Sequence, residues 1–416
     1  MQGSNPRFPL FDSLRAMAAL GVFVFHLPVV AQMSLDNPVR PYLLVLNIGI
    51  AVFFLISGFL LYRPFAQARY DGDKAPATVL YAERRALRIV PAYWVALVFV
   101  VLLLGKAGES PTSSPVFTPE GVLRYFGFLQ IYDSDTLLGG ISAAWTLCVE
   151  VTFYAMLPLW AVLLRRVPFR SRRGFLRSEL LALAALFVVG VTWTAVAAPS
   201  SEDAAAAFSN VTLIEPGLYV LPAFLDHFAL GMAIAVFSVA LADRARQPNA
   251  VGVIDRAPWL PWLVAALAFV AIANLDKLTP ENWTLRMVST HVLQGVFAFA
   301  LLLPAVFGDP DRGFVRRLLA NRMLLWVGLV SYGLYLWHVA VNVKLVEWGV
   351  LDSLGSVGYI AVALAVALLA ATASFYGVER HALRLGRRLS HRRRSQDADI
   401  RMRDLSRHER AEPGVP

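Results

Sequence analysis

The stretch Phe11–Leu27 has the sequence FDSLRAMAALGVFVFHL and is apolar apart from a few side chains. Among these are Asp12, Arg15 and His26, and an ionisable group costs about 2.5 to 3.5 kcal/mol at the centre of a bilayer helix. Arg15 and His26 are eleven positions apart, so 3.6 residues per turn place both on one helix face, about 16 Å apart along its axis. A signal anchor with polar groups near the membrane edges explains Asp12 and Arg15. It does not explain His26, because intramembrane histidines usually face a cavity or a partner, and we predict a functional role for it.

The composition of the whole chain indicates a polytopic membrane protein. Hydrophobic residues make up 57% and charged residues only 16% of its 416 residues, which excludes an ordinary soluble globule. The one cysteine, Cys148, lies in an apolar segment, so neither a disulfide framework nor a cysteine metal site is expected. The net charge of +9 comes from short basic clusters between apolar runs, which favours a role in topology over nucleic-acid binding.

Ten apolar runs are long enough to span a bilayer, at about 20 residues per span. Their limits are 12–31, 42–62, 87–104, 143–164, 178–198, 217–241, 258–275, 286–307, 323–348 and 356–378. Cytoplasmic loops should hold the excess of Lys and Arg; the fourth connection, 165–177, holds six arginines and the fifth, 199–216, holds none. Eleven more arginines follow the last run, from Arg380 to Arg410. We therefore predict an all-α bundle of about ten transmembrane helices with both termini cytoplasmic, in the inner (plasma) membrane.

The chain divides into a transmembrane domain, 1–380, and a basic tail, 381–416. The tail is rich in Arg, Ser, Asp and Glu, so we predict that it is disordered and that its arginines meet anionic lipid headgroups. In the longest external connection, Thr118–Tyr132 carries apolar and aromatic residues at mixed spacing, which suggests an interfacial helix over the outer mouth. The first run has charges at its start and no convincing small-residue cleavage site, so we expect it to stay in the membrane.

Five short motifs lie in or beside the apolar runs. They are Arg15 with ten intervening residues before His26, FFLISGF at Phe53–Phe59, ERRALRIVP at Glu83–Pro91, WTLCVEVTFY at Trp145–Tyr154, and SYGLYLWH at Ser331–His338. With these motifs in this order, the chain resembles the acyltransferase 3 family of bacterial integral-membrane acyltransferases. The fourth motif departs from the family pattern, with Cys148 where serine is common and Thr152 where glutamine is common. This departure concerns the choice of acceptor more than the chemistry.

The resemblance implies transfer of an acyl group, acetyl or another short chain, from cytoplasmic acyl-CoA to a hydroxyl group. The acceptor implied is a cell-envelope carbohydrate, a glycolipid or a secreted natural product. The resemblance also implies that His26 is the general base and that the paired arginines Arg85 and Arg88 belong to the acyl-CoA site. Acyl-CoA is then a co-substrate, and no metal is expected.

The residues by themselves support the assignment of His26. Acyl transfer to a hydroxyl needs a base for the O–H proton and positive charge or donors near the developing oxyanion. An imidazole, with an ordinary pKa of about 6.5, suits the first role. Glu150 is our candidate for orienting the imidazole, because the first and fourth spans run in opposite directions and the two residues fall at similar depth. Alternatively, Glu150 is a carboxylate at the headgroup level near Trp145.

Positive charge gathers at the cytoplasmic end of the third span. Arg85 and Arg88 lie three positions apart on one helix face, a spacing with which two guanidiniums can clamp the phosphates of CoA. Clustered arginines at this place are equally what topology demands. Arg15 lies on the same membrane side, where it either holds a phosphate or the thioester end, or pairs with Asp12.

Smaller polar groups occur in the second and ninth spans. Ser57 and Gly58 lie in the inner half of the second span, where close helix packing is their expected role. Ser331, Tyr335 and His338 follow i, i+4, i+7 spacing and form a polar stripe that should face the interior. We expect Tyr335 and His338 to line a channel or to hydrogen-bond within the bundle, and we assign catalysis to neither.

Asp226, His227 and His291 are further polar residues near the outer mouth. They could contact an acceptor sugar, but adjacent Asp and His side chains point to different helix faces, so they need not form a dyad. Several histidines with a carboxylate also suggest a metal site. No metal-ligand spacing such as His, three residues, His occurs, and we predict no metal.

Three functions remain open on the sequence. The first is an O-acyltransferase that uses acyl-CoA, and the second is a transporter or flippase whose intramembrane ionisable groups form a relay. The third is a membrane scaffold that keeps its polar residues for helix association. The paired arginines and the matching depths of His26 and Glu150 favour the acyltransferase.

Overall fold

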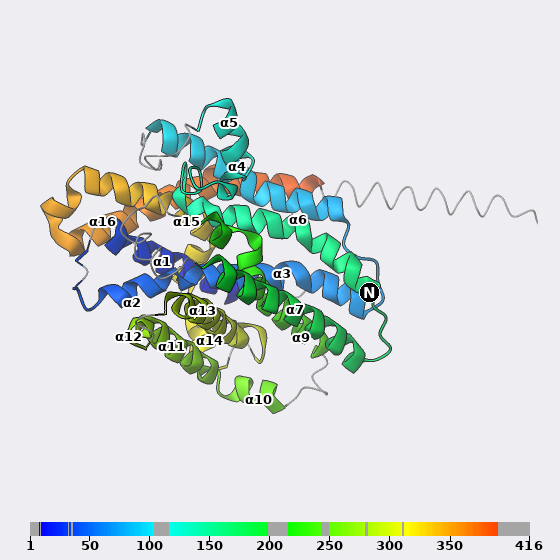
Figure 1. Ribbon diagram of the computed structural model, residues 1–416. Helices are drawn as coiled ribbons and strands as arrows, with labels where there is room; N and C mark the ends of the chain where they lie inside the picture. The colour runs from blue at the N-terminus through cyan, green and yellow to red at the C-terminus, as the bar shows by residue number, and fades with distance from the viewer. Residues whose placement is uncertain are drawn as a thin grey trace, which may run out of the picture.

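The computed structural model describes residues 8, 10–31, 33–34, 36–103, 116–198, 215–242, 249–278, 282–309 and 312–389. Within these ranges every regular element is a helix. The long helices run roughly side by side as one bundle (Figure 1). The predicted fold class, an all-α membrane protein, is therefore confirmed.

The elements fall into long helices and short connecting turns. The long helices are α1 (Leu10–Val30), α3 (Gly49–Tyr70), α4 (Thr78–Leu103), α6 (Trp145–Arg165), α7 (Arg172–Ala197), α9 (Leu225–Ala240), α11 (Trp259–Ala273), α13 (Trp283–Val306), α15 (Arg322–Glu347) and α16 (Val350–Ser374). The short elements are α2 (Arg40–Leu44), η1 (Val45–Ile48), α5 (Pro119–Gly121), η3 (Val122–Phe126), η4 (Gln130–Tyr132), η5 (Ser142–Ala144), η6 (Pro216–Tyr219), η7 (Leu221–Phe224), α10 (Asn249–Arg256), α12 (Leu275–Leu278), α14 (Phe314–Leu319) and η9 (Phe375–Glu379).

Capping side chains fix where several of these helices begin. Ser171, Asn282 and Asn321 precede α7, α13 and α15, and each side chain accepts a hydrogen bond from a backbone N–H of the first turn. Such caps satisfy amide donors that have no partner inside the helix. Short polar residues between apolar runs are thus a local reason why the spans start where they do.

Nine of the ten predicted spans correspond to long apolar helices among the described residues. The exception is the seventh predicted span, 258–275, where α11 has only 15 residues. At 1.5 Å per residue it is about 22 Å long, shorter than a hydrocarbon core of about 30 Å. The prediction of ten spans is therefore met by nine long helices and one short apolar helix, and the cytoplasmic placement of both termini stays a prediction.

Helices α3 and α9 form the interior of the bundle. Of the most apolar part of α9, 72% is buried, against 22% for α7 and for the last span, Val350–Leu389. Figure 1 shows α3 between α6 on one side and α13 and α9 on the other, with α1 and α15 close by. The interior helices therefore carry side chains that can reach one another, whereas α7 and α16 turn most of their surface outward.

The stretch before α6 differs from the sequence-based expectation, and the division into two domains stays a prediction. The stretch Thr118–Tyr132 is not one interfacial helix but a series of short turns, α5, η3 and η4. The predicted domain boundary at 380 falls inside a continuous helical segment that runs on to Leu389. The predicted disorder of the tail concerns 390–416, which lie outside the described residues.

Candidate active site

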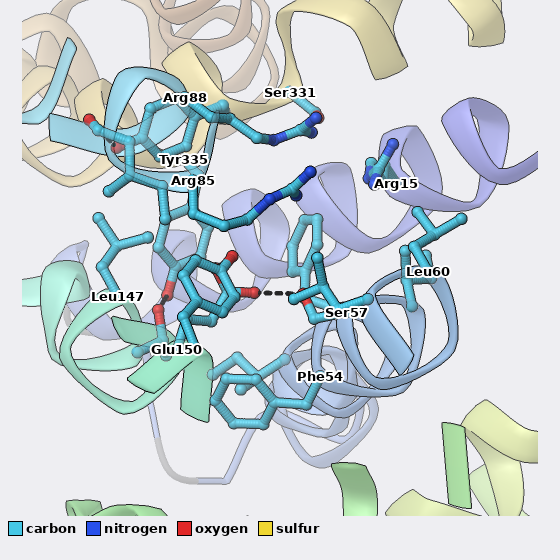
Figure 2. A pocket seen from close by; sticks show the side chains of 18 residues that line it. Arg15, Phe54, Ser57, Leu60, Arg85, Arg88, Leu147, Glu150, Ser331 and Tyr335 are labelled. Carbon is cyan, nitrogen blue, oxygen red and sulfur yellow. Dashed lines mark hydrogen bonds between the residues drawn. The ribbon is translucent and has the colours of Figure 1, made fainter. Parts of the chain in front are cut away.

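A cavity of about 90 Å³ lies inside the bundle between α1, α3, α4, α6 and α15. Its polar lining comes from Arg15 on α1, Ser57 on α3, Arg85 and Arg88 on α4, and Glu150 on α6 (Figure 2). Helix α15 adds residues of the last motif. All five motifs therefore contribute residues to this one cavity, although they are spread over most of the chain.

The charges on the cavity wall do not balance. Three guanidiniums and one carboxylate line it, and in Figure 2 Arg85 and Arg88 extend from α4 toward Arg15. Arg15 also forms an ion pair with Asp12, at 2.9 Å between Nη1 and Oδ1, but the Asp12 side chain is 46% exposed and does not line the cavity. The excess of positive charge suits an anionic ligand, and guanidiniums are the preferred partners of phosphate.

Glu150 is held in the cavity by two hydroxyl groups. Its Oε1 accepts a hydrogen bond from Ser57 Oγ at 2.6 Å, drawn in Figure 2, and its Oε2 accepts one from the Tyr154 hydroxyl at 2.9 Å. Hydrogen bonds to an ionised group are stronger than those between neutral groups, at about 1.5 to 3 kcal/mol each. The carboxylate thus faces the bundle interior and not the lipid headgroups.

Close packing of α3 on α9 sets the position of Ser57. A methyl group on Gly58 would overlap the Phe228 carbonyl oxygen, and one on Gly231 would overlap the carbonyl oxygen of Leu55. Only glycines at both positions allow the two backbones to approach this closely. Gly58 therefore has the packing role expected of this pair of residues, and Ser57 has a polar contact that the sequence did not predict.

His26 forms a pair with His338 in the C-terminal halves of α1 and α15. Its Nδ1 lies 2.8 Å from the Val22 carbonyl oxygen and 3.1 Å from His338 Nε2. The two rings are 4.7 Å apart between centroids, at 70°. His338 is buried and its own Nδ1 lies 2.8 Å from the Tyr335 carbonyl oxygen, while His26 is half-buried.

These contacts determine the tautomers of both neutral imidazoles. A carbonyl oxygen only accepts, so Nδ1 of each ring must carry the hydrogen. The single hydrogen on His26 Nδ1 is then shared between the Val22 carbonyl oxygen and His338 Nε2, and the lone pair of His26 is on Nε2. No described residue bonds to His26 Nε2, which leaves this atom able to take a proton from a ligand.

Tyr335 connects the histidine pair to the cavity. It lines the cavity, its hydroxyl lies 2.8 Å from Thr146 Oγ1, and it donates to the Ala143 carbonyl oxygen at 3.0 Å. Its ring centroid is 5.7 Å from that of His338, and Thr146 also lines the cavity. The arginines and the histidines therefore stand at two ends of one row of polar groups, separated by the contact between Tyr335 and Thr146.

The predicted contact between His26 and Glu150 is absent from the described part of the chain. Both oxygens of Glu150 bond to other side chains, and His26 is oriented by Val22 and His338. Two residues at similar height can lie on different sides of a bundle, so similar depth in two spans does not bring His26 and Glu150 together. Nothing in one sequence relates His26 to His338 across 312 positions.

A second buried polar cluster, which the sequence did not predict, joins α3 and α7. Glu179 of α7 is fully buried and bonds to the Arg69 guanidinium and to the hydroxyl of Tyr62. Arg69 also donates to the Val167 carbonyl oxygen at 2.8 Å. A lone carboxylate at the start of an apolar run was the signal that could have revealed it, since such a group needs a buried partner.

A larger cavity of about 490 Å³ is lined by parts of η1, α3, α6, α7, η6, η7, α9 and α13, and we call it the outer cavity after the topology predicted from the loop charges. His291 lines this cavity, and its Nε2 donates at 2.9 Å to Oδ1 of Asp226, which is buried and not part of the lining. His227 stacks on His291 at 4.2 Å and donates from Nε2 to the His291 carbonyl oxygen. The sequence suggested only that Asp226 and its neighbour His227 need not form a dyad; His227 Nε2 lies 3.8 Å from Asp226 Oδ2, and the hydrogen bond of Asp226 to His291 was not predicted.

This cluster has the residue types of a metal site, with ligand atoms within 4.8 Å of one another. Its geometry suits hydrogen bonding better. Nε2 of both histidines is engaged, and the rings are stacked at 26°, whereas metal ligands must aim their in-plane lone pairs at one point. The absence of a metal stays a prediction.

The sequence is similar to a known protein family and to several named proteins. The sequence model of the family described as "Acyltransferase domain" matches residues 9–376. The chain is 26% identical to "Acyltransferase MdmB" of Streptomyces mycarofaciens over 377 residues, which cover 88% of this chain and 87% of that protein. No solved structure matches the chain.

Two further relatives are longer proteins. "O-acetyltransferase OatA" of Staphylococcus aureus (strain NCTC 8325 / PS 47) is 24% identical, over 88% of this chain and 56% of its own length. "Putative peptidoglycan O-acetyltransferase YrhL" of Bacillus subtilis (strain 168) is 24% identical, over 80% of this chain and 48% of its own length. The chain therefore spans about half the length of these two relatives.

Proposed function

The chain belongs to the acyltransferase family whose model matches residues 9–376, and from this premise we propose that it moves an acyl group from cytoplasmic acyl-CoA to a hydroxyl group. The acceptor we propose is an envelope carbohydrate, a glycolipid or a secreted metabolite, and the membrane is the inner (plasma) membrane. Membership of this family makes the chain a membrane enzyme, which decides against the transporter and scaffold alternatives. The names of the relatives favour acetyl as the acyl group.

The observation that carries the proposal is the charge of the cavity lined by Arg15, Arg85, Arg88 and Glu150, which we call the inner cavity. Three guanidiniums face one carboxylate there, and CoA is a polyanion whose phosphates such groups bind in a bidentate way. The arginines lie toward the side that the basic loops assign to the cytoplasm, where acyl-CoA is found. The long pantetheine arm of CoA can carry the thioester from the arginines toward the histidine pair.

Glu150 balances part of this charge. Without it, three guanidiniums would repel one another in a poorly solvated site, where charges interact more strongly than in water. With it, the lining keeps an excess of two positive charges for the ligand. We assign Glu150 to holding the donor site together, with Ser57 and Tyr154 fixing its carboxylate.

His26 supplies the base for the chemical step. The acceptor oxygen attacks the thioester carbonyl carbon, so a C–O bond forms while the C–S bond to CoA breaks. The hydroxyl proton passes to His26 Nε2 and then to the departing CoA sulfur. His338 and the Val22 carbonyl hold the imidazole so that Nε2 faces the reacting atoms.

Binding of acetyl-CoA to purified protein in nanodiscs tests this assignment. Loss of one charge-assisted hydrogen bond is worth about 1.5 to 3 kcal/mol, so Arg85→Gln or Arg88→Gln should raise the Kd of radiolabelled acetyl-CoA about 10-fold to 150-fold. Arg84→Gln is the matched control, because Arg84 carries the same charge on the same helix, is exposed and does not line the cavity. An equal loss of affinity in all three variants would show that bulk charge, not the cavity, binds the donor.

A further inference from the structure

The outer cavity has the size and lining of a small-molecule site. Its volume of about 490 Å³ lies within the range of about 300 to 1,000 Å³ that is usual for ligand pockets. Trp145, Tyr219 and Phe224 form one aromatic wall, with 4.9 Å between the ring centroids of Trp145 and Tyr219 and 5.6 Å between those of Trp145 and Phe224. Trp283 on α13 adds a further aromatic side chain to the lining.

Polar groups complete the lining of this cavity. Asn47 and Gln294 bond to each other at 3.2 Å across η1 and α13, and each keeps further donor or acceptor capacity. Thr290 and His291 line the same space. Arg286 also lines this cavity, with its guanidinium carbon 5.4 Å from the centroid of the Trp283 ring. A ring with apolar C–H faces and hydroxyl groups on its edge matches such a mixture of aromatic surface and polar hydrogen-bonding side chains.

The contact between Asp226 and His291 fixes one acceptor atom in this wall. Asp226 is fully buried and accepts the Nε2 hydrogen of His291, so the lone pair of that imidazole is on Nδ1. No described residue bonds to this Nδ1, and the ring lines the cavity. A carboxylate that orients a histidine in this way is the usual means of holding an imidazole ready to receive a proton or a hydroxyl hydrogen.

Burial of this carboxylate is costly in a purely structural role. Asp226 Oδ2 is buried, makes no hydrogen bond within the described residues and lies 3.8 Å from His227 Nε2; a buried acceptor without a hydrogen bond costs roughly 1 to 3 kcal/mol. The inner cavity makes no use of Asp226, His227 or His291. His227 and His291 line the outer cavity, and Asp226 is connected to it through its hydrogen bond with His291.

The two cavities share a wall. The side chain of Ile50 lines both of them, and on α6 the neighbours Trp145 and Thr146 line the outer and inner cavity respectively. Ile50 also packs against Val22 and Tyr335, the residues next to the histidine pair. A ligand in the outer cavity is thus separated from the donor side by one layer of side chains.

We propose that the outer cavity binds the acceptor as a sugar ring, with His291 Nδ1 accepting a hydrogen bond from one of its hydroxyl groups. This inference rests on the proposed acyl transfer. Asp226 acts through His291 and is a positioning residue. The aromatic wall packs on the C–H face of the ring, and Asn47 and Gln294 bond to its other hydroxyl groups.

Sugar binding is measured directly and without turnover. Methyl glycosides of glucose, N-acetylglucosamine and rhamnose are titrated into the full chain in nanodiscs, with quenching of tryptophan fluorescence as the readout because Trp145 and Trp283 line the cavity. We expect at least one glycoside to quench saturably. His291→Phe, which keeps a ring and removes both nitrogens, should raise its Kd at least 10-fold, and His381→Phe, at an exposed position on the last helix, should not.

Two further measurements keep the result interpretable. Acetyl-CoA binding reports that each variant is folded, and Thr290→Trp, which places bulk in the open cavity, should abolish quenching while acetyl-CoA still binds. In an acyl-transfer assay, Asp226→Asn should raise the KM for the acceptor more than it lowers kcat, because it disturbs orientation of His291 and not the donor.

Absence of quenching by all three glycosides, or equal quenching in a folded His291→Phe or Thr290→Trp variant, would overturn the inference. Sugar binding without acetyl-CoA binding would contradict the proposed function and leave the site standing.

Discussion

Replacing Gly58 with alanine tests whether the contact between α3 and α9 sets the geometry of the inner cavity. The added methyl group would overlap the Phe228 carbonyl oxygen and would lie 3.2 Å from its carbonyl carbon. Non-bonded atoms pack at roughly 3.5 Å, so relief of this overlap displaces one helix by about 1 Å. Overpacking of this kind costs about 1 to 3 kcal/mol.

The displacement reaches the cavity through Ser57, the neighbouring residue. A shift of about 1 Å would lengthen its 2.6 Å hydrogen bond to Glu150 beyond the range of about 3 Å for such bonds. A catalytic site misplaced by 1 Å loses activity by about 100-fold. We therefore expect Gly58→Ala to lower both the free energy of unfolding and kcat for acyl transfer.

The assay compares Gly58→Ala with Gly377→Ala in the same detergent. A methyl group on Gly377 meets no atom within 4 Å, so this change removes the same glycine flexibility without overlap and should be neutral or stabilise by up to about 1 kcal/mol. Thermal unfolding midpoints and initial transfer rates are measured for both proteins. The reasoning fails if Gly58→Ala unfolds at the same midpoint as Gly377→Ala and keeps full activity.

Three further predictions concern parts of the chain away from the reaction. Arg316→Met should lower the free energy of unfolding by about 3 kcal/mol or more, because the buried guanidinium donates to several backbone carbonyls at the end of α13. Arg317→Met, at a more exposed position, should change it by less than about 0.5 kcal/mol in the same thermal unfolding experiment. Glu179→Gln should lower the unfolding midpoint more than it lowers the acetyl-CoA affinity of the folded fraction, since this carboxylate does not line the donor cavity. The Arg124 guanidinium holds the pKa of Asp133 below its usual range. The Asp133 carboxylate therefore stabilises the loop that holds both residues fully above about pH 4, and this stabilisation is lost as pH falls through the lowered pKa. Hydrogen exchange of this loop should quicken on acidification in the wild type and be less dependent on pH in Asp133→Asn.

The fold followed from apolar runs because the length of a span is set by the bilayer. The seventh run shows the limit of that argument: 258–275 has the composition of a span, yet α11 ends at Ala273 after only 15 residues and packs along α13. The outer stretch Thr118–Tyr132 shows another limit, since mixed spacing without a clear 3.6-residue period gave short turns.

The motifs identified residues that line the inner cavity, but they did not identify the contacts that these residues make. Arg15, Arg85, Arg88 and Glu150 line one space because their helices meet, and the charge cost of burying each in lipid was a sufficient reason to expect this. The partner of His26 could not be found, because helical pitch fixes height and face within one span and does not fix which span lies opposite. The contact between Asp226 and His291 was missed for the same reason.

The rate of acyl transfer by His26→Gln, measured at saturating acetyl-CoA beside the Kd for acetyl-CoA, tests the central claim most directly. A general base contributes about 100-fold to 10,000-fold, so the account predicts a loss of this size in kcat with donor affinity unchanged, because the imidazole lies apart from the guanidinium-lined cavity. A loss of less than 10-fold, or a loss of donor binding to match the loss of rate, would contradict it.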